Sequence, residues 1–301
     1  MAKRIFAGPW VGEFGWELFC WQGWLRKQAR DVDEMIVASR PDMEYLYRDF
    51  CTEFIPVDSP PTSSNERCDG FELPCLYRDY PDHEWCNPLV RRAVMQPLNI
   101  PVLADQEFIR FGTHRKKPRY DIIFHARSTA KARTQLRNWP LDRWEALREK
   151  LSNYRIASIG SMTGAMHVPG TVDLRHQNLQ QTCTALRNAK LAVGPSSGPM
   201  HLASLCGTPQ LVWSEPRNKV RYVKHWNPHN TKVYFLELWK PKVAHVLAEC
   251  PLYTGPESDP VQRKRYRKHR RKAAWKRWGH QLLIMHPEMK KRVRTRRKRR
   301  K

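Results

Sequence analysis

The stretch from Val193 to Pro209, VGPSSGPMHLASLCGTP, constrains the fold of this chain more than any other part of the sequence. Apolar residues lead into it as a buried strand, which small residues and proline then interrupt. Apolar side chains recur through the following residues as in a short helix, and Gly207 ends that helix. The next residues, QLVW, have the composition of a second buried strand. The stretch therefore predicts strand, turn, helix and strand, which is the repeating unit of a parallel α/β sheet.

The turn in this unit is suited to an anion. The first turn of a helix has backbone N–H groups without partners and carries positive potential. Gly198 lets a ligand approach the backbone, and Ser196 and Ser197 can cap the helix or bind a phosphate oxygen. The alternative interpretation is a capped helix on a parallel sheet with no ligand at all.

Strands and helices alternate along most of the remaining sequence. We expect strands at residues 4–7, 35–39, 54–57, 120–127, 155–160, 190–193, 210–213 and 232–238. We expect helices at residues 16–30, 43–50, 142–150 and 178–189, the third opened by a capping box of Asp142 and Glu145. Residues 59–88 are rich in Pro, Ser, Asp and Cys, and we expect loops there. The pattern predicts the α/β class with parallel sheets.

Two carboxylates follow the first strand, Glu13 in a glycine-rich loop and Glu17 at the start of the helix. They are four residues apart, so both can face the same way if the helix begins early. Either carboxylate is a candidate general base, which removes a proton from a hydroxyl. The alternative is that Glu17 stabilises the helix N-terminus electrostatically and that Glu13 is solvated.

Two arginines mark a second group of candidates. Arg127 ends the expected strand at residues 120–127, and the carboxyl ends of parallel strands line the ligand crevice in α/β sheets. Arg137 lies in the basic loop STAKARTQLRNWP, and guanidinium groups are strong phosphate ligands. A solvated loop is the alternative interpretation.

Three of these segments resemble glycosyltransferase family 9, the ADP-heptose lipopolysaccharide heptosyltransferases. The family has a small-residue turn followed by G-P-x-H-L-A and G-x-P, as in GPSSGPMHLASLCGTP. It also has a basic residue before x-W-P, as in RNWP, and glycine with an acidic residue after the first strand, as in Gly12-Glu13. This chain departs from the family pattern at Ser196, where the family usually has an acidic residue, and at Glu13, where it usually has Asp.

The resemblance implies a GT-B fold, in which two Rossmann-like domains face a cleft. Residues 1–118 would be the acceptor domain, residues 119–250 the nucleotide-sugar donor domain, and residues 251–301 a basic tail. It implies an inverting, metal-independent transfer with no cofactor beyond the nucleotide-diphosphate sugar as co-substrate, and with Glu13 or Glu17 as the base. The implied donor-binding residues are Arg127, Arg137, Ser196, Ser197, Gly198 and His201. For His201 the alternative is a histidine that only caps or packs the helix.

The C-terminal residues carry most of the charge of the protein. The chain has 54 Lys and Arg against 29 Asp and Glu, a net charge of +25, and 20 of the basic residues lie from Val261 to Lys301. Such a block binds polyanions, with nucleic acid as the first expected partner and an anionic membrane surface as the second. A sorting signal or a solubilising tail are further alternatives. The candidate nucleic-acid-binding residues are Arg263, Lys264, Arg265, Arg267, Arg270, Arg271, Trp275 and Trp278.

These features leave two classes of function. The first is a glycosyltransferase whose acceptor is a glycan or a modified nucleic acid. The second is a non-catalytic, glycosyltransferase-like protein that binds nucleic acid or serves as a scaffold. Turnover of a nucleotide sugar distinguishes them.

The expected compartment is the cytoplasm, which is the host cytoplasm if the chain is virus-encoded. None of the eight cysteines forms a C-x-x-C pair, so reduced thiols are expected rather than a zinc site. No apolar run approaches the roughly 18 residues that a membrane-spanning helix requires. The N-terminal residues do not have the pattern of a signal peptide.

Overall fold

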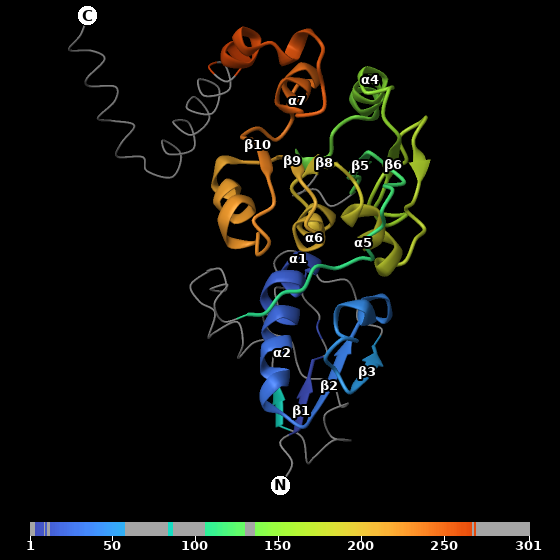
Figure 1. The fold of residues 1–301 in the computed structure, drawn as a ribbon, viewed down its shortest axis with the longest axis vertical. Helices are drawn as coiled ribbons and strands as arrows, with labels where there is room; N and C mark the ends of the chain where they lie inside the picture. Colours follow the sequence, from blue (N-terminus) through green and yellow to red (C-terminus); the bar gives the residue numbers. More distant parts are fainter. Residues whose placement is uncertain are drawn as a thin grey trace, which may run out of the picture.

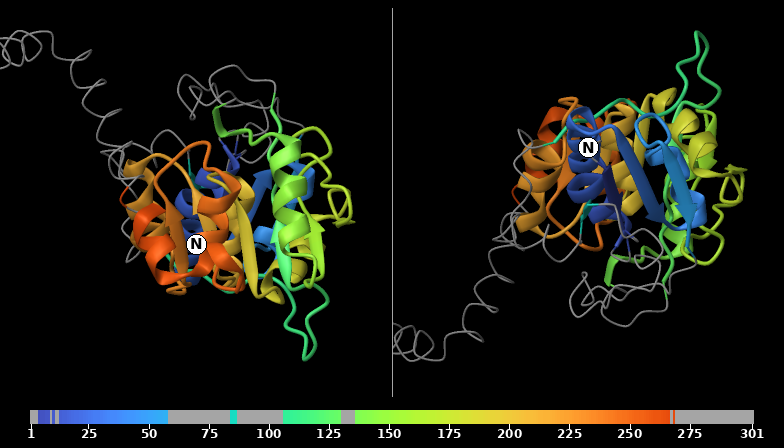
Figure 2. Two further views of the ribbon diagram at one scale, coloured as in Figure 1. Left: turned by 90° about the horizontal axis from the view of Figure 1, so that it is seen from above. Right: turned by 90° about the horizontal axis from the view of Figure 1, so that it is seen from below.

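The protein folds into two α/β lobes, one built on each of two parallel sheets (Figure 1). The computed structural model describes residues 4–8, 10, 13–57, 84–86, 106–129, 136–266 and 268. The loops expected at residues 59–88 and most of the basic tail lie outside these residues. Seen along the long axis of the molecule, the two lobes lie one over the other (Figure 2).

The N-terminal lobe is built on a four-stranded sheet with the order β3-β2-β1-β4. Its strands are β1 (Arg4–Ala7), β2 (Glu34–Ser39), β3 (Glu53–Pro56) and β4 (Glu84–Cys86), and every pairing is parallel. A helical stretch joins β1 to β2: α1 (Phe14–Trp16), the π-helical turn η1 (Glu17–Trp21), α2 (Gln22–Gln28) and the 3₁₀ turn η2 (Ala29–Asp31). It buries Leu18, Trp21 and Leu25, which confirms the helix expected at residues 16–30.

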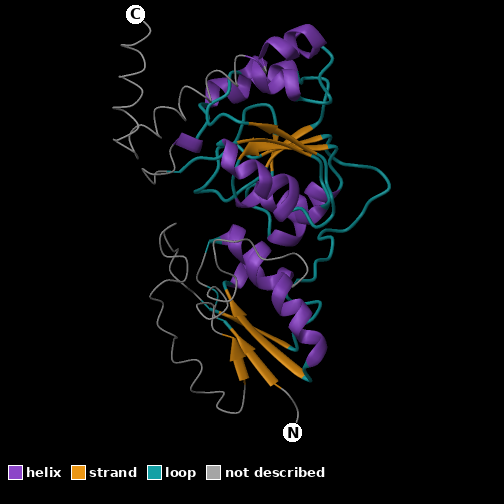
Figure 3. Ribbon diagram, turned by 90° about the vertical axis from the view of Figure 1, so that its left-hand side faces the viewer, coloured by secondary structure: helices purple, strands orange, loops and turns teal. Residues whose placement is uncertain are grey.

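The C-terminal lobe is built on a six-stranded parallel sheet with the order β10-β9-β8-β5-β6-β7. Its strands are β5 (Ile122–Phe124), β6 (Ile156–Ser158), β7 (Val172–Asp173), β8 (Leu191–Pro195), β9 (Gln210–Trp213) and β10 (Val233–Leu236). Its helices are α4 (Leu141–Lys150), α5 (Leu179–Arg187), α6 (Gly198–Cys206) and α7 (Val243–Glu249). Helices cover both faces of this sheet (Figure 3), with α4 and α7 in contact with each other on one face and α5 and α6 on the other.

Four aromatic side chains form the centre of the core between the C-terminal sheet and helix α4. The rings of Trp139, Trp144 and Trp213 lie 5.1–5.4 Å apart, and Phe124 lies 5.1 Å from Trp144. All four are fully buried, so the tryptophan of the RNWP motif is part of the hydrophobic core.

Two local predictions need correction. The helix expected at residues 43–50 is instead the 3₁₀ helix η3 (Pro41–Leu46), a form that occurs in short pieces. The capping box of Asp142 and Glu145 is wrong, because Pro140 is the N-cap residue of α4 and no side chain caps that helix. A capping box occurs instead at α5, between Asn178 and Gln181.

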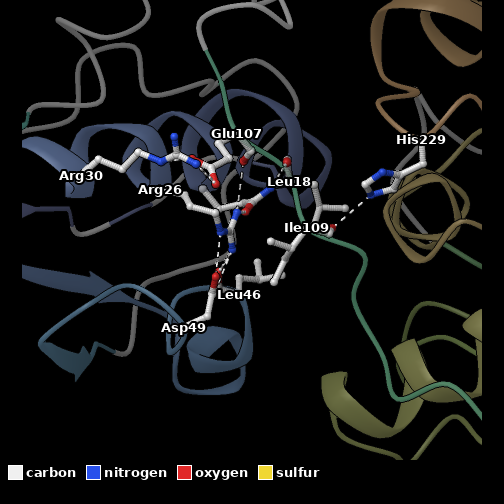
Figure 4. Close-up of polar contacts among 9 residues, drawn as sticks. Leu18, Arg26, Arg30, Leu46, Asp49, Glu107, Ile109 and His229 are labelled. Atoms are coloured by element: carbon white, nitrogen blue, oxygen red, sulfur yellow. Dashed lines mark hydrogen bonds and ion pairs between the residues drawn. The ribbon is translucent and has the colours of Figure 1, made fainter.

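Residues 106–113 pass from one lobe to the other and are bonded to both (Figure 4). The guanidinium of Arg26 forms a two-pronged ion pair with Asp49, at 2.9 and 3.0 Å, and also donates to the Glu107 carbonyl. From the C-terminal lobe, His229 Nε2 donates to the Ile109 carbonyl at 3.1 Å. Arg187 donates to the carbonyls of residues 110 and 112 at 2.6 and 2.8 Å. We call residues 106–113 the strap.

The first residues of the basic tail are helical. Asp259 accepts hydrogen bonds from the backbone N–H groups of Val261 and Gln262 at 2.9 and 3.0 Å, and thereby caps a helix over residues 260–266. Tyr266 packs edge-on against His245 of α7, with ring centroids 5.2 Å apart. This helix therefore rests on the C-terminal lobe.

Candidate active site between the lobes

A cleft of about 620 Å³ lies between the two lobes. The N-terminal lobe contributes Glu13 to Trp16, and the C-terminal lobe contributes the ends of β5 and β8 and the start of α6. Seven residues that the sequence analysis selected line it together: Glu13, Arg127, Arg137, Ser196, Ser197, Gly198 and His201. Glu17, the other candidate base, is absent from the lining.

Helices α1 and α6 approach each other closely beside the cleft, and two glycines allow this. A Cβ atom on Gly198 would lie 2.7 Å from Cδ1 of Phe14, which is too close for any side chain. A Cβ atom on Gly15 would lie 3.3 Å from Cδ2 of His201. The rings of Phe19 and Trp226 stack at 5.1 Å, so an apolar contact joins the lobes beside the polar cleft.

Glu13 is the N-cap residue of α1. Its backbone carbonyl accepts the N–H groups of Trp16 and Glu17 at 3.0 and 3.1 Å, while its side chain makes no capping hydrogen bond. Glu13 lines the cleft, and its charge partly offsets the lowering of the Arg127 pKa that burial and Arg137 cause. Glu13 is therefore placed where a ligand in the cleft can meet its carboxylate.

Glu17 lies in a buried polar cluster of the N-terminal lobe. Its carboxylate accepts hydrogen bonds from Ser39 Oγ at 2.6 Å and Tyr47 Oη at 2.7 Å, and it forms an ion pair with Arg40. Its side chain is fully buried, and burial raises its pKa. The expectation that both glutamates face the same way is wrong, because Glu13 has the extended backbone of an N-cap residue while Glu17 lies inside the helical stretch.

Arg127 and Arg137 lie on the C-terminal side of the cleft. Arg127 donates to Asn138 Oδ1 at 3.0 Å, and Asn138 in turn donates to the Thr129 carbonyl at 2.9 Å. Burial lowers the pKa of Arg127 to about 10, and the neighbouring charge of Arg137 acts in the same direction. The guanidinium of Arg137 lies 5.2 Å from the centre of the Trp239 ring. The charges of Arg127 and Arg137 act on each other. An anion bound between the two guanidinium groups would relieve this repulsion.

The turn between β8 and α6 has most of its polar groups bonded within the protein. The backbone N–H of Ser196 donates to the Trp213 carbonyl at 2.9 Å, and the N–H of Ser197 donates to Tyr222 Oη at 3.1 Å. Because Pro199 has no N–H group and the N–H of His201 is bonded to the Ser197 carbonyl, Gly198 is the donor in the cleft lining that the first turn of α6 offers to a ligand. The N–H groups of Ser196 and Ser197 thus already have partners within the protein.

His201 is buried at the floor of the cleft. Its ring stacks on Tyr222 with centroids 4.3 Å apart and meets Trp226 edge-on at 4.6 Å. Burial lowers its pKa well below the ordinary value, and the charges of Arg221 and Arg137 lower it further, so the ring is neutral at neutral pH. Its Nδ1 is buried with no hydrogen-bond partner among the described residues, which suits a ligand-binding role.

Several lining residues were missed or only placed on a loop. Arg221 and Trp226 line the cleft from the π-helical turn η8 (Arg221–His225) and its C-cap, and Tyr222 of the same turn is buried and stacks on His201. The alternation of basic and aromatic residues in RYVKHW is the signal that marks this turn in the sequence. His125, at the end of β5, donates Nδ1–H to the Ile159 carbonyl at 3.1 Å, and burial lowers its pKa to about 4.

The tail residues are only partly described. Arg263, Lys264 and Arg265 lie on the helix over residues 260–266, next to α7 and at the opposite end of the C-terminal lobe from the cleft (Figure 1). The remaining candidates lie outside the described residues: Arg267, Arg270, Arg271, Trp275 and Trp278.

Within the described ranges, no group of three or more His, Cys, Asp or Glu side chains is arranged to hold a metal ion. None of the helices in that part of the chain has the length and apolarity that crossing a bilayer requires. Five cysteines of the same part are not in disulfides: Cys20, Cys51, Cys183, Cys206 and Cys250.

Comparison with known proteins rests on structure alone. No family model matches the sequence, and no curated protein matches it either. The structure is similar to ADP-heptose lipopolysaccharide heptosyltransferase II of E. coli, with a TM-score of 0.54 and 14% identity, over 82% of this chain and 97% of that one.

Two further matches score lower. A glycosyl transferase of family 9 from Veillonella parvula DSM 2008 has a TM-score of 0.49 at 12% identity, over 78% of this chain and 85% of that one. E. coli heptosyltransferase WaaC with ADP has a TM-score of 0.49 at 11% identity, over 79% and 94%. The likeness to heptosyltransferase II shows that this chain has the two-lobed GT-B-type fold that its sequence predicts.

Proposed function

We propose that this protein is a glycosyltransferase that moves a sugar from a nucleotide-diphosphate sugar to an acceptor hydroxyl. One observation carries the proposal: the fold brings a carboxylate of the N-terminal lobe and the arginines and helix α6 of the C-terminal lobe to a single cleft. An acid–base group and an anion site on opposite walls are what group transfer from a diphosphate requires.

Glu13 is the proposed base. It accepts the proton of the acceptor hydroxyl, whose oxygen forms a bond to the anomeric carbon of the sugar. The bond from that carbon to the diphosphate oxygen breaks on the opposite side, and its electron pair stays on the diphosphate. The configuration at the anomeric carbon is therefore inverted.

The C-terminal lobe stabilises the leaving diphosphate. Arg127 and Arg137 supply positive charge, and Gly198 at the start of α6 brings its N–H group to the same cleft. His201 is neutral and offers one donor and one acceptor. We propose that these groups alone balance the developing charge, so that the transfer is metal-independent.

The proposed acceptor is a glycan or a modified nucleic acid, and the proposed compartment is the cytoplasm. The basic tail supports a polyanionic partner, with nucleic acid first and an anionic membrane surface second, because neutralising phosphates is driven by charge and needs no sequence code. The helix over residues 260–266 presents the first of these basic residues from the lobe that would hold the donor.

A thermal-shift screen tests the donor site. The panel contains nucleoside diphosphates and nucleotide sugars, with ADP and ADP-heptose first, because the similar structures are of a heptosyltransferase named for ADP-heptose and of one solved with ADP. We expect one nucleotide to raise the melting temperature by mass action, and Arg137→Ala to lose that shift.

A turnover assay then separates the two classes of function. Hydrolysis or transfer of the bound nucleotide sugar supports the enzyme. Binding without turnover with any acceptor favours a non-catalytic protein that binds nucleic acid, and no nucleotide binding at all contradicts the donor site.

A further inference from the structure

The turn between β8 and α6 is held by one side chain from another part of the chain. Tyr222 is fully buried, and its hydroxyl lies 3.1 Å from the backbone nitrogen of Ser197 and 3.2 Å from Oγ of Ser196. The same ring stacks on His201. The side chain of Tyr222 therefore contacts three residues of the cleft lining: Ser196, Ser197 and His201.

Tyr222 reaches this position because it lies on a π-helical turn. The wider turn of η8 ends with the N–H of Trp226 bonded to the Arg221 carbonyl at 2.7 Å. Arg221 and Trp226 line the cleft on either side of the buried phenol. Single π-helical turns inside helices are frequent at functional sites, because the extra residue redirects side chains.

The hydrogen bonds at Tyr222 fix the polarity of Ser196. Since the Ser197 N–H can only donate, the phenol oxygen accepts that bond and its own proton is directed to Ser196 Oγ. Burial raises the pKa of Tyr222 to about 12, so this proton is present at every physiological pH. Oγ of Ser196 is thereby an acceptor towards Tyr222, and its own proton is directed elsewhere.

The cleft is where that proton can be used. Ser196 lines the cleft, and its backbone N–H is already bonded to Trp213. We propose that Tyr222 is a positioning residue that makes Ser196 a hydrogen-bond donor to a phosphate oxygen bound in the cleft. This inference rests on the proposed donor site. It implies that the ligand atom facing Ser196 is a hydrogen-bond acceptor. The acidic residue that the resembling family usually has at this position would instead accept a hydrogen bond from a ligand hydroxyl.

The test is a double-mutant cycle measured by isothermal titration calorimetry on the full chain. The variants are Tyr222→Phe, Ser196→Ala and the double variant, each titrated with ADP and, in parallel, with inorganic pyrophosphate. Tyr222→Phe keeps the ring against His201 and removes only the hydroxyl. Tyr234→Phe, in strand β10 and outside the cleft lining, is the matched control.

We expect each single substitution to weaken binding of the diphosphate about two- to tenfold, the worth of one hydrogen bond. The double variant should bind no more weakly than Ser196→Ala, because Tyr222 acts through that hydroxyl. Tyr222→Phe should also lower the melting temperature of the ligand-free protein, since the buried Ser197 N–H loses its partner. Tyr234→Phe should leave the affinity unchanged.

Two results would overturn the inference: multiplicative losses in the double variant, or unchanged or tighter binding by Tyr222→Phe. Pyrophosphate separates this inference from the proposed function. A wild-type protein that binds pyrophosphate with the expected coupling but turns over no nucleotide sugar supports the inference and contradicts the proposed transfer. A wild-type protein that binds neither probe overturns both.

Discussion

His125 and His201 are buried among the arginines of the cleft and stay neutral at neutral pH. Burial lowers the pKa of both imidazoles, to about 4 for His125. In the unfolded chain both would take up a proton near pH 6.5. The folded protein binds fewer protons than the unfolded chain below that pH, so protonation favours unfolding as the pH falls.

Acid should therefore reduce stability through these two side chains. Below pH 6.5, and down to about pH 4 for His125, each histidine should lower the free energy of unfolding by about 1.4 kcal/mol per pH unit at most. His125→Asn and His201→Asn should flatten this slope in urea denaturation at pH 6.5, 5.5 and 4.5. His114→Asn, on an exposed segment, is the control. If the unfolding free energy of the two cleft variants depends on pH as steeply as that of the wild type, the two histidines do not cause the loss of stability in acid.

Glu13→Gln should abolish turnover while it preserves nucleotide binding. The amide keeps the size of the side chain but cannot remove the proton from the hydroxyl of the acceptor substrate. We therefore expect kcat to fall about 10²- to 10⁴-fold. Glu215→Gln is the matched control, because Glu215 also lines the cleft, where it pairs with Arg217 at 2.6 Å. It should change KM more than kcat. Equal kcat losses in both variants would remove Glu13 from the role of base.

Glu17→Gln should affect stability rather than chemistry. It leaves Arg40 without its buried counter-charge, which costs about 3 kcal/mol for pairs of this kind. Glu34→Gln breaks an ion pair with Arg4 at the surface and should cost less than about 1 kcal/mol. Urea denaturation measures both. A Glu17 variant of normal stability that lacks activity would restore Glu17 as a candidate base.

At the scale of elements, the contact between α1 and α6 joins the acid–base side of the cleft to the anion side. Phe14 follows Glu13 directly and lies against Gly198, so any change in the spacing of these helices moves Glu13 relative to the first turn of α6. The distance between Glu13 and the first turn of α6 is thus set by the contact between Phe14 and Gly198.

Gly198→Ala should disturb both lobes at once. The new methyl group would lie 2.7 Å from the Phe14 ring and must push α1 away, at a cost of about 1–3 kcal/mol. Nucleotide affinity and kcat should both fall. Phe14→Leu in the same chain removes the clash and should restore part of the stability, measured by urea denaturation. A double variant no more stable than Gly198→Ala would show that the contact has another role.

Elements with a strong local pattern were predictable from sequence. QLVW forms β9 over the expected residues, and Gly207 ends α6 with a positive φ of 76°. Elements that depend on distant partners were not. The two-residue strand β7 is too short to have a pattern of its own and forms because it pairs with β6. Helix α7 was missed although Val243, Val246 and Leu247 have helical spacing. The π-helical turn η8 has no sequence rule that separates it from an ordinary loop.

The candidate site was predictable where a residue follows a strand or starts a helix. Arg127 and Ser196 follow parallel strands, and such strand ends meet at one edge of a sheet. The role of Tyr222 was not predictable, because only the packing of η8 brings its phenol to a turn 25 residues away. The choice between Glu13 and Glu17 also needed tertiary contacts, since the partners of Glu17 come from β2 and beyond.

At the scale of the whole molecule, the proposed anion site in the cleft and the described start of the basic tail are separate. The described start of the tail lies beside α7, away from the cleft (Figure 1). Substitutions in the cleft should therefore change nucleotide affinity without changing polyanion affinity, and substitutions in the tail should do the reverse.

Removal of residues 267–301 should abolish binding to DNA and leave nucleotide binding intact. The deletion retains Tyr266 and its contact with His245, so the C-terminal lobe keeps its packing. DNA affinity measured against salt concentration should lose its steep slope, because fewer phosphates are neutralised. The thermal shift with nucleotide should not change. Unchanged DNA affinity would show that the polyanion binds elsewhere.

The strap over residues 106–113 determines how far the two lobes are independent modules. Its carbonyl groups accept bonds from both sides, from Arg26 in one lobe and from Arg187 and His229 in the other. Neither lobe expressed alone would satisfy these donors. Exchange of one lobe for that of another protein must therefore carry the strap and its donors along.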